Sequence, residues 1–240
     1  MRRAATAAAT SIRGRGAHDE ARARRRPNRR QVLAAPALGA IAPLPAWAAK
    51  RAPKGFRSVR DRLDGYEFDY PSTWVPVTSA GADVFYRNPE DPQECVFVDV
   101  SSPSSSKFES VRDLGTPRDA AEFVNQKLID EFLSTRLGVR RKSEVLDAAE
   151  RTASDGELYF DVAVRVRSYV DSNPLSPNPE DRREYEEWDR TLRTTLGVAN
   201  GRLYSLRLQA PTNTSAESVA RAKSVANSFR AFVVDPADTE

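Results

Sequence analysis

A long run of alternating side chains near the middle of the chain constrains the fold more than any other feature. In the segment Glu157–Tyr169 every second residue is apolar, and the residues between them are mostly polar. Such alternation is typical of a β-strand with one face in the core, because successive side chains of a strand point to opposite sides. The pattern predicts the longest strand of the chain, whose core face carries Leu158, Phe160, Val162, Val164 and Val166.

Shorter segments of similar character lie on both sides of this strand in the sequence. Turn-forming pairs such as Asp155-Gly156 and Asn200-Gly201 separate some of them, which suits tight connections between antiparallel neighbours. Cys95–Val100 has mostly apolar residues on both sides, which indicates a central, covered strand. The predicted strands are 65–70, 74–77, 83–86, 95–100, 143–152, 157–169, 188–198 and 202–210.

Two helices are predicted, one between the strands and one after them. The first follows the capping residue Thr116, has Pro117 at its first position, and has a suitable end at Gly138. The second follows the capping-box sequence Thr214–Glu217. This order predicts an α+β fold, a single-domain α/β/α sandwich over residues 65–240 with a mainly antiparallel sheet flanked by helices.

The N-terminal region has a different character and predicts a targeting signal. Residues 28–48 contain the pair Arg29-Arg30, an apolar run, and the small residues Ala46 and Ala48 around a tryptophan. A membrane anchor is the alternative, but the run is shorter than the about 20 residues that a spanning helix needs. It also contains three prolines, which break helix hydrogen bonds. The layout favours a cleavable twin-arginine signal.

Residues 1–27 precede this signal and contain eight arginines against two acidic residues. Arginine-rich, acid-poor leaders are typical of organelle transit peptides. A transit peptide followed by a bacterial-type signal predicts two successive transport steps, which are import into the chloroplast and transfer into the thylakoid lumen.

The charge and composition of the remaining chain argue against several function classes. Residues 49–240 hold 27 basic and 32 acidic residues, a net charge of −5, which gives no support for a nucleic-acid-binding protein. The only histidine, His18, lies in the leader, and Cys95 is the only cysteine. A histidine-based triad or metal site is therefore excluded from residues 49–240, and a non-enzymatic protein is favoured.

Three segments resemble the PsbP family. Gly65–Trp74 resembles the first strand of its fold, Asp83–Arg87 its next strand, and Gly201–Pro211 its last hairpin strand. The resemblance implies an antiparallel sheet between helices in a lumenal, non-enzymatic protein. Such a protein helps to retain calcium and chloride at the manganese cluster of photosystem II, or it helps photosystems to assemble. The long loop Asp171–Glu187 favours a PsbP-domain relative over PsbP itself.

Two charged segments are candidate sites. Residues 49–64 are predicted to be a flexible basic lead-in, for which the family resemblance implies docking on an acidic lumenal surface; a solvated tail is the alternative. Its candidate docking residues are Lys50, Arg51, Lys54, Arg57 and Arg60. An acidic segment further along supplies carboxylates for calcium without EF-hand spacing, so a solvated charged loop is the alternative there. Its candidate ligands are Glu184, Glu187 and Asp189.

Two classes of function follow from these observations. The first is a non-catalytic extrinsic protein on the lumenal face of photosystem II, of photosystem I or of an assembly intermediate. The second is a lumenal small-molecule carrier, or an enzyme that uses carboxylates alone. We expect a monomer peripheral to the membrane, without a nucleic-acid partner or a tightly bound cofactor; calcium is implied only by the resemblance.

Overall fold

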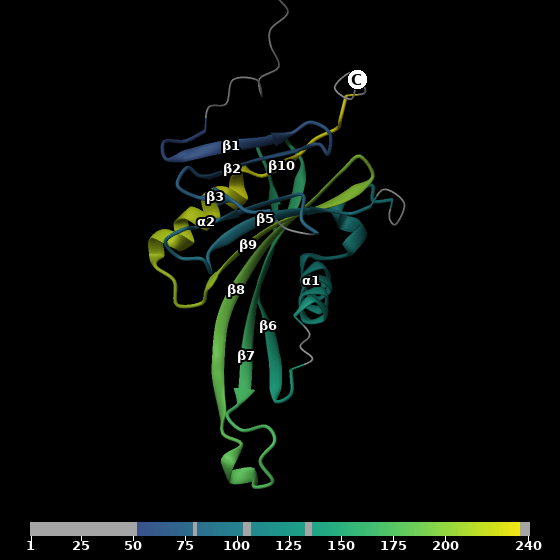
Figure 1. The fold of residues 1–240 in the computed structure, drawn as a ribbon. Coiled ribbons are helices and arrows are strands. Elements are labelled where there is room, and N and C mark those ends of the chain that lie inside the picture. Colours follow the sequence, from purple (N-terminus) through teal and green to yellow (C-terminus); the bar gives the residue numbers. More distant parts are fainter. Residues whose placement is uncertain (1–51, 79–80, 103–106, 133–135, 236–240) are drawn as a thin grey trace, which may run out of the picture. The chain divides into compact units, whose positions relative to one another are not determined.

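Two antiparallel sheets and two α-helices form the part of the chain that the structure, a computed structural model, describes (Figure 1). The described residues are 52–78, 81–102, 107–132 and 136–235. The larger sheet has the order β3 (Val75–Pro76), β4 (Val84–Arg87), β5 (Cys95–Val100), β9 (Arg202–Pro211), β8 (Glu184–Ala199), β7 (Leu158–Asp171) and β6 (Val139–Thr152). The smaller sheet has the order β1 (Phe56–Asp61), β2 (Tyr66–Pro71) and β10 (Arg230–Ala231).

The two faces of the larger sheet bury separate cores. Helix α1 (Pro117–Glu131) packs on one face, where its Val124 and Leu128 meet Phe160 of β7. Helix α2 (Ala216–Ser228) packs on the other face together with the smaller sheet, and there Tyr159 of β7 meets Phe229, with 6.1 Å between the ring centroids. Neighbouring residues of β7 thus serve opposite cores, as the alternating pattern predicts.

The mainly antiparallel α+β fold is confirmed, but its second face is not covered by a helix alone. The three-stranded sheet, which the sequence pattern does not predict, shares that face with α2. Its first strand, Phe56–Asp61, pairs with β2 over its whole length. The prediction of a flexible lead-in is therefore wrong for these six residues, because backbone pairing holds them in place.

The helix caps agree with the sequence at one helix and differ at the other. Thr116 caps α1 in a reciprocal capping box with Asp119, as expected, although the helix ends at Glu131, well before Gly138. At α2 the capping residue is Ser215, whose hydroxyl accepts from the Ser218 amide at 3.1 Å. Thr214 is not the cap, because its hydroxyl donates to a buried carboxylate instead.

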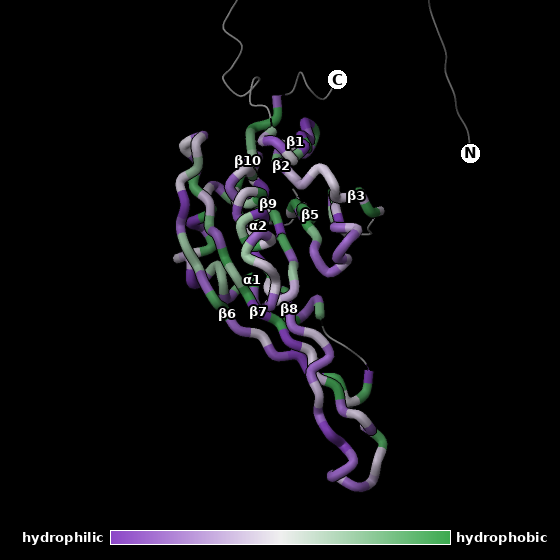
Figure 2. Tube along the Cα trace, turned by 90° about the vertical axis from the view of Figure 1, so that its left-hand side faces the viewer, coloured by the Kyte–Doolittle hydropathy of each residue, from purple (hydrophilic) through white to green (hydrophobic). Residues whose placement is uncertain are grey.

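The C-terminal end of β7 and the N-terminal end of β8 extend beyond β9, because β9 pairs with β8 only from Arg190 onward. The segment 172–183 connects these two ends at the tip of the extension (Figure 1). Figure 2 shows that this extension is mostly hydrophilic, in contrast to the central strands. Strand β8 already begins at Glu184, so the predicted loop Asp171–Glu187 is too long at its end. Among the described residues, no helix has the length and hydropathy that crossing a bilayer requires.

Candidate functional site

The predicted basic docking segment is only partly available at the surface. Lys54 and Arg57 are exposed, the latter on strand β1. Arg60 is half-buried, and its Nη1 lies 2.8 Å from Oε2 of Glu67 in an ion pair. Outside the described residues lie Lys50, Arg51 and the four predicted signal residues Arg29, Arg30, Ala46 and Ala48. Docking through this segment stays a prediction that rests on two exposed side chains.

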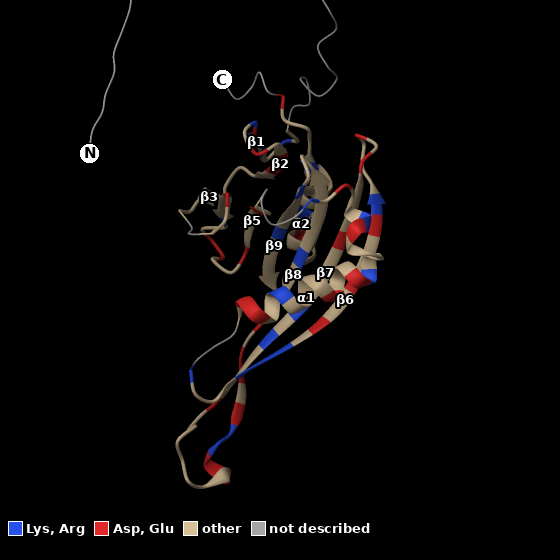
Figure 3. Cartoon of the chain, turned by 90° about the vertical axis from the view of Figure 1, so that its right-hand side faces the viewer, with Lys and Arg blue, Asp and Glu red and all other residues tan. Residues whose placement is uncertain are grey.

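The three carboxylates predicted as metal ligands lie on β8, and each has an arginine partner. Acidic and basic residues are mixed along β6, β7 and β8 (Figure 3). The pairs are Arg140–Glu184 at 2.5 Å, Arg136–Glu187 at 2.7 Å and Arg165–Asp189 at 2.5 Å. Within the described ranges, no three acidic, histidine or cysteine side chains are grouped as metal ligands would be. The structure therefore does not assemble the predicted ligands into one site.

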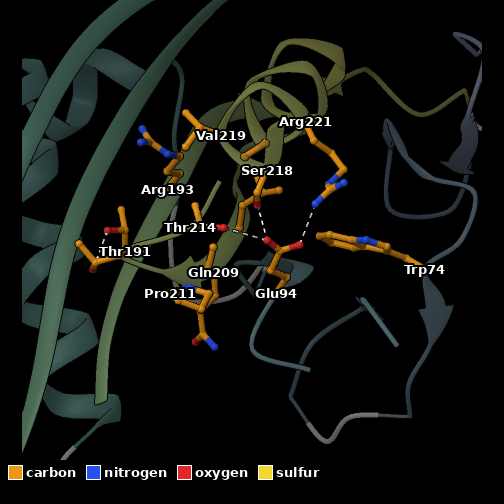
Figure 4. A pocket seen from close by; sticks show the side chains of 14 residues that line it. Trp74, Glu94, Thr191, Arg193, Gln209, Pro211, Thr214, Ser218, Val219 and Arg221 are labelled. Atoms are coloured by element: carbon orange, nitrogen blue, oxygen red, sulfur yellow. Dashed lines mark hydrogen bonds and ion pairs between the residues drawn. The ribbon is translucent and has the colours of Figure 1, made fainter. Parts of the chain in front are cut away.

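A small pocket between the larger sheet and α2 surrounds Glu94, the residue before β5 (Figure 4). This side chain is buried and accepts hydrogen bonds from four groups. The donors are Asn88 Nδ2 at 3.0 Å, Thr214 Oγ1 at 3.1 Å, Arg221 Nη2 at 3.0 Å and the hydroxyl of Ser218. Burial opposes ionisation of Glu94, but these hydrogen bonds and the Arg221 charge outweigh it and lower the pKa of the carboxyl.

The Glu94 pocket is a structural connection rather than a binding site. Its free volume is about 50 Å³, which is enough for only a few water molecules. A carboxylate offers about four lone-pair positions, and four donors already occupy those of Glu94. The arrangement joins the β4–β5 connection to the start of α2, where Ser218 and Arg221 lie.

A larger groove, of about 650 Å³, lies on the opposite face of the same sheet. The strand register places Arg87 of β4 opposite Cys95 of β5, and Cys95 opposite Gln209 of β9. Residues directly opposite in an antiparallel pair share a face, so these side chains form one row across the groove. Beside the row, Phe85 and Phe97 pack edge to face with 5.9 Å between their centroids and give the groove an apolar wall.

Part of the groove's charge is neutralised within the chain. The side chain of Arg207 is buried, with its Nη2 2.7 Å from Asp99 Oδ2 and its Nη1 2.5 Å from Glu131 Oε2. Lys127 of α1 lies 3.8 Å from Glu131. Two cations therefore balance two acids at the side of the groove next to α1.

Arg87 and Arg190 differ from these neighbours. Among the described residues, neither guanidinium has an ion pair or a hydrogen bond, and the Nε atom of each is buried without a partner. Each guanidinium lies near an aromatic ring: Arg190 is 4.5 Å from the ring centroid of Trp188, and Arg87 is 5.3 Å from that of Phe85. The groove lining thus keeps two positive charges in excess, although residues 49–240 are net acidic.

Cys95 lines the same groove as the two arginines. Burial raises the pKa of its thiol to about 11, while the charges of Arg87 and Arg190 both act to lower it. Burial likewise lowers the pKa of Arg190 from its usual value. The thiol is protonated at neutral pH and is a poor nucleophile. The groove is therefore suited to holding an anion rather than to covalent chemistry.

The sequence identifies some of these residues and misses others. It predicts a covered strand over Cys95–Val100, and the Cys95 side chain is buried. Neither Arg87 nor Arg190 is predicted as a site residue. A faint signal exists, because each arginine lies in or at the end of a strand with large aromatic neighbours. Their convergence, however, follows only from the register of four strands.

The fold and the groove define an α+β domain with a basic, partly apolar candidate binding surface. The PsbP family model matches residues 54–231, so the chain belongs to the PsbP family. PsbP domain-containing protein 1, chloroplastic, of Arabidopsis thaliana is 44% identical over 175 residues, which are 73% of this chain and 61% of that protein. The match thus spans less than two thirds of that relative.

Two further relatives agree with this family membership. PsbP-like protein 1, chloroplastic, of the same plant is 26% identical over 203 residues, which are 84% of this chain and 75% of that protein. The solution structure of cyanobacterial PsbP (CyanoP) from Synechocystis sp. PCC 6803 has a TM-score of 0.53 and 24% identity, and the match covers 75% of this chain and 95% of that one. This likeness concerns the fold.

Proposed function

We propose that the chain is a non-catalytic accessory protein of the thylakoid lumen that docks on the lumenal face of a photosystem complex. The family match over residues 54–231 carries this proposal. Two relatives described as chloroplastic support the compartment, and so does the predicted pair of targeting signals in residues 1–48.

The role that we propose is support of photosystem II oxygen evolution or of photosystem assembly, exerted through contact rather than through chemistry. In the structure, Glu184, Glu187 and Asp189 are each paired with an arginine. We therefore propose that any effect on calcium retention comes from covering the partner's site, and not from calcium ligands on this chain.

Crosslinking in isolated thylakoids tests this function. A tagged chain is produced in chloroplasts, the thylakoids are separated from the stroma, and crosslinked partners are identified by mass spectrometry. We expect a protease-protected protein with crosslinks to lumenal loops of photosystem subunits. A monomer that is recovered with a bound small molecule and without photosystem crosslinks would contradict the proposal and favour a carrier.

A matched variant tests the compartment separately. Replacing Arg29 and Arg30 by lysine preserves charge but removes the arginine pair on which the predicted transport depends. We expect this variant to accumulate in the stroma. If it reached the lumen as efficiently as the unchanged chain, the twin-arginine prediction would be wrong, whereas crosslinks to photosystem subunits would still report docking.

A further inference from the structure

We propose that the groove beside Arg87 and Arg190 binds an acidic, partly apolar peptide segment of a partner protein, with a carboxylate held between the two guanidinium groups. This inference deepens the proposed function and rests on it for the location of the partner. It goes further by naming the surface and the chemistry that the surface recognises.

The strand order brings the two arginines together across the groove. Arg87 lies on β4 and Arg190 on β8, with β5 and β9 between them. The residue of β8 in the same cross-strand row as Arg87 is Leu192, and Arg190 lies two residues along the strand from it. With strands about 4.8 Å apart and about 3.3 Å per residue, the two arginines start roughly 16 Å apart on the sheet. Both side chains nevertheless line the same groove, together with Cys95 of β5, a strand that lies between β4 and β8. A carboxylate above Cys95 is therefore within reach of both side chains.

The state of these guanidinium groups favours an anionic ligand. The Nε atoms of Arg87 and Arg190 are buried, but their Nη atoms are accessible and have no hydrogen bond among the described residues. Arginine binds carboxylates through paired, charge-assisted hydrogen bonds, which are stronger than neutral ones. Since Arg207 is already occupied by Asp99 and Glu131, the excess charge of the groove comes from the two unpaired arginines.

The apolar wall favours a peptide over a small inorganic anion. Phe85 and Phe97 line the groove next to the arginines, together with Ala82 and Pro92. In a peptide with a carboxylate side chain followed by an apolar one, the carboxylate can bind the arginines and the apolar side chain can pack on the phenylalanine wall. The volume of about 650 Å³ lies within the range of ligand sites and is far larger than an inorganic anion needs.

Fluorescence anisotropy with the full chain tests this inference. The probe is a fluorescein-labelled peptide in which glutamates alternate with phenylalanine, and the comparison peptide has glutamine in place of every glutamate. We expect saturable binding of the acidic peptide that weakens with added salt. Arg87→Gln and Arg190→Gln should each weaken binding about tenfold, as the loss of a charge-assisted hydrogen bond predicts.

Arg193→Gln is the matched control. Arg193 lies on the same strand as Arg190 and has no ion pair within the described residues, but it lines the Glu94 pocket on the opposite face. We expect this variant to bind like the unchanged chain, and thermal unfolding of all variants will show that they fold. Equal weakening by Arg193→Gln, or equally tight binding of the glutamine peptide, would overturn the inference.

Inorganic phosphate provides a further test of the ligand class. If phosphate at a concentration comparable to that of the peptide displaced it completely, the groove would be a general anion site, and the peptide assignment would be wrong. The thylakoid experiment separates the two proposals. Photosystem crosslinks that persist in the Arg87→Gln/Arg190→Gln variant would overturn the groove alone, and arginine-dependent peptide binding without such crosslinks would overturn the proposed function alone.

Discussion

Two pockets on opposite faces of the same sheet contain polar groups in opposite states. Glu94 is surrounded by four hydrogen-bond donors in a space of about 50 Å³. One residue later the chain turns its next side chain, Cys95, to the other face, where Arg87 and Arg190 have no polar partner among the described residues. The polar groups of the first pocket are satisfied within the chain, and the two arginines of the second are not.

This contrast separates residues that hold the fold from residues that are available for a partner. A buried charge whose hydrogen bonds are satisfied destabilises the protein strongly when one partner is removed. An unpaired charge at the edge of a groove contributes little to folding and can be replaced without a large loss of stability. Substitutions in the two pockets should therefore differ in size and in kind.

Glu94→Ala is expected to have the largest effect on stability. It leaves Arg221 and Asn88 without their buried acceptor, and it removes the connection between β5 and α2. We expect the free energy of unfolding to fall by about 3 kcal/mol or more, as measured by chemical denaturation. Glu217→Ala is the control, because the Glu217 side chain is 88% exposed and lies 3.9 Å from the same Arg221. A similar loss in both variants would contradict the contrast.

Acid titration sharpens the same comparison. The pKa of Glu94 in the folded protein lies below its ordinary value of 4.5. The unfolded chain therefore binds more protons between these two pKa values, and stability from this group falls as the pH drops below about 4.5. Glu94→Gln should flatten this part of the stability curve relative to the unchanged chain. If the free energy of unfolding fell equally steeply with decreasing pH in both proteins, Glu94 would not be the source of this pH dependence.

Arg207→Gln is expected to have the next largest effect, and it tests a paired arginine within the groove itself. The substitution leaves Asp99 without the cation that opposes the burial-driven rise in its pKa, while the exposed part of Glu131 can be hydrated. We expect a loss of about 2 kcal/mol in the free energy of unfolding and a further rise in the Asp99 pKa, measured by NMR titration. An unchanged Asp99 pKa would show that the ion pair is not formed.

The sequence predicts the parts of the fold that depend on local patterns. The alternation of β7, the apolar character of β5 and the cap at Thr116 all reflect forces that act within one segment. Strand β1 is missed because its residues FRSVRD are largely polar and lack an alternating pattern. It is held by pairing with β2, and only Phe56 and Val59 pack against the core. Strand β10 has only two residues, too few for any period.

The candidate sites illustrate a second limit of sequence reasoning. Glu184 and Glu187 are acidic and close in sequence, which predicts a loop or a metal site. In the structure, Arg140 of β6 pairs with Glu184, and Arg136, just before β6, pairs with Glu187. Arg87 and Arg190 are far apart in the sequence, and nothing local indicates that they share a groove. The ion pairs of the two glutamates and the shared groove of the two arginines both depend on how strands are aligned with one another. This register is a property of pairs of strands and not of single segments.

The Arg87→Gln/Arg190→Gln variant should leave stability almost unchanged. Neither side chain loses an ion pair. The cation–π contacts with Phe85 and Trp188 are lost, and the removal of two buried Nε atoms that lack partners offsets this loss. We expect the free energy of unfolding to stay within about 0.5 kcal/mol of the unchanged chain, as measured by the same denaturation experiment as for Glu94→Ala. A loss as large as that of Arg207→Gln would show that the two arginines stabilise the fold, and the contrast between the pockets would fail.

Alkylation of Cys95 should give the smallest but most local signal. Burial raises the thiol pKa to about 11, and both arginines act to lower it. Since the thiolate is the reactive form, N-ethylmaleimide should react slowly at pH 8 and progressively faster toward that pKa. In the Arg87→Gln/Arg190→Gln variant the pKa should rise further, so alkylation at pH 9 should be slower.

Because Cys95 is the only cysteine, mass spectrometry of the intact chain measures this reaction directly. The Arg193→Gln variant, altered on the opposite face of β8, should react at the unchanged rate. If the double variant reacted at the same rate as the unchanged chain, the two guanidinium groups would not act together at Cys95. The groove would then lack the convergent charge on which binding of a carboxylate depends.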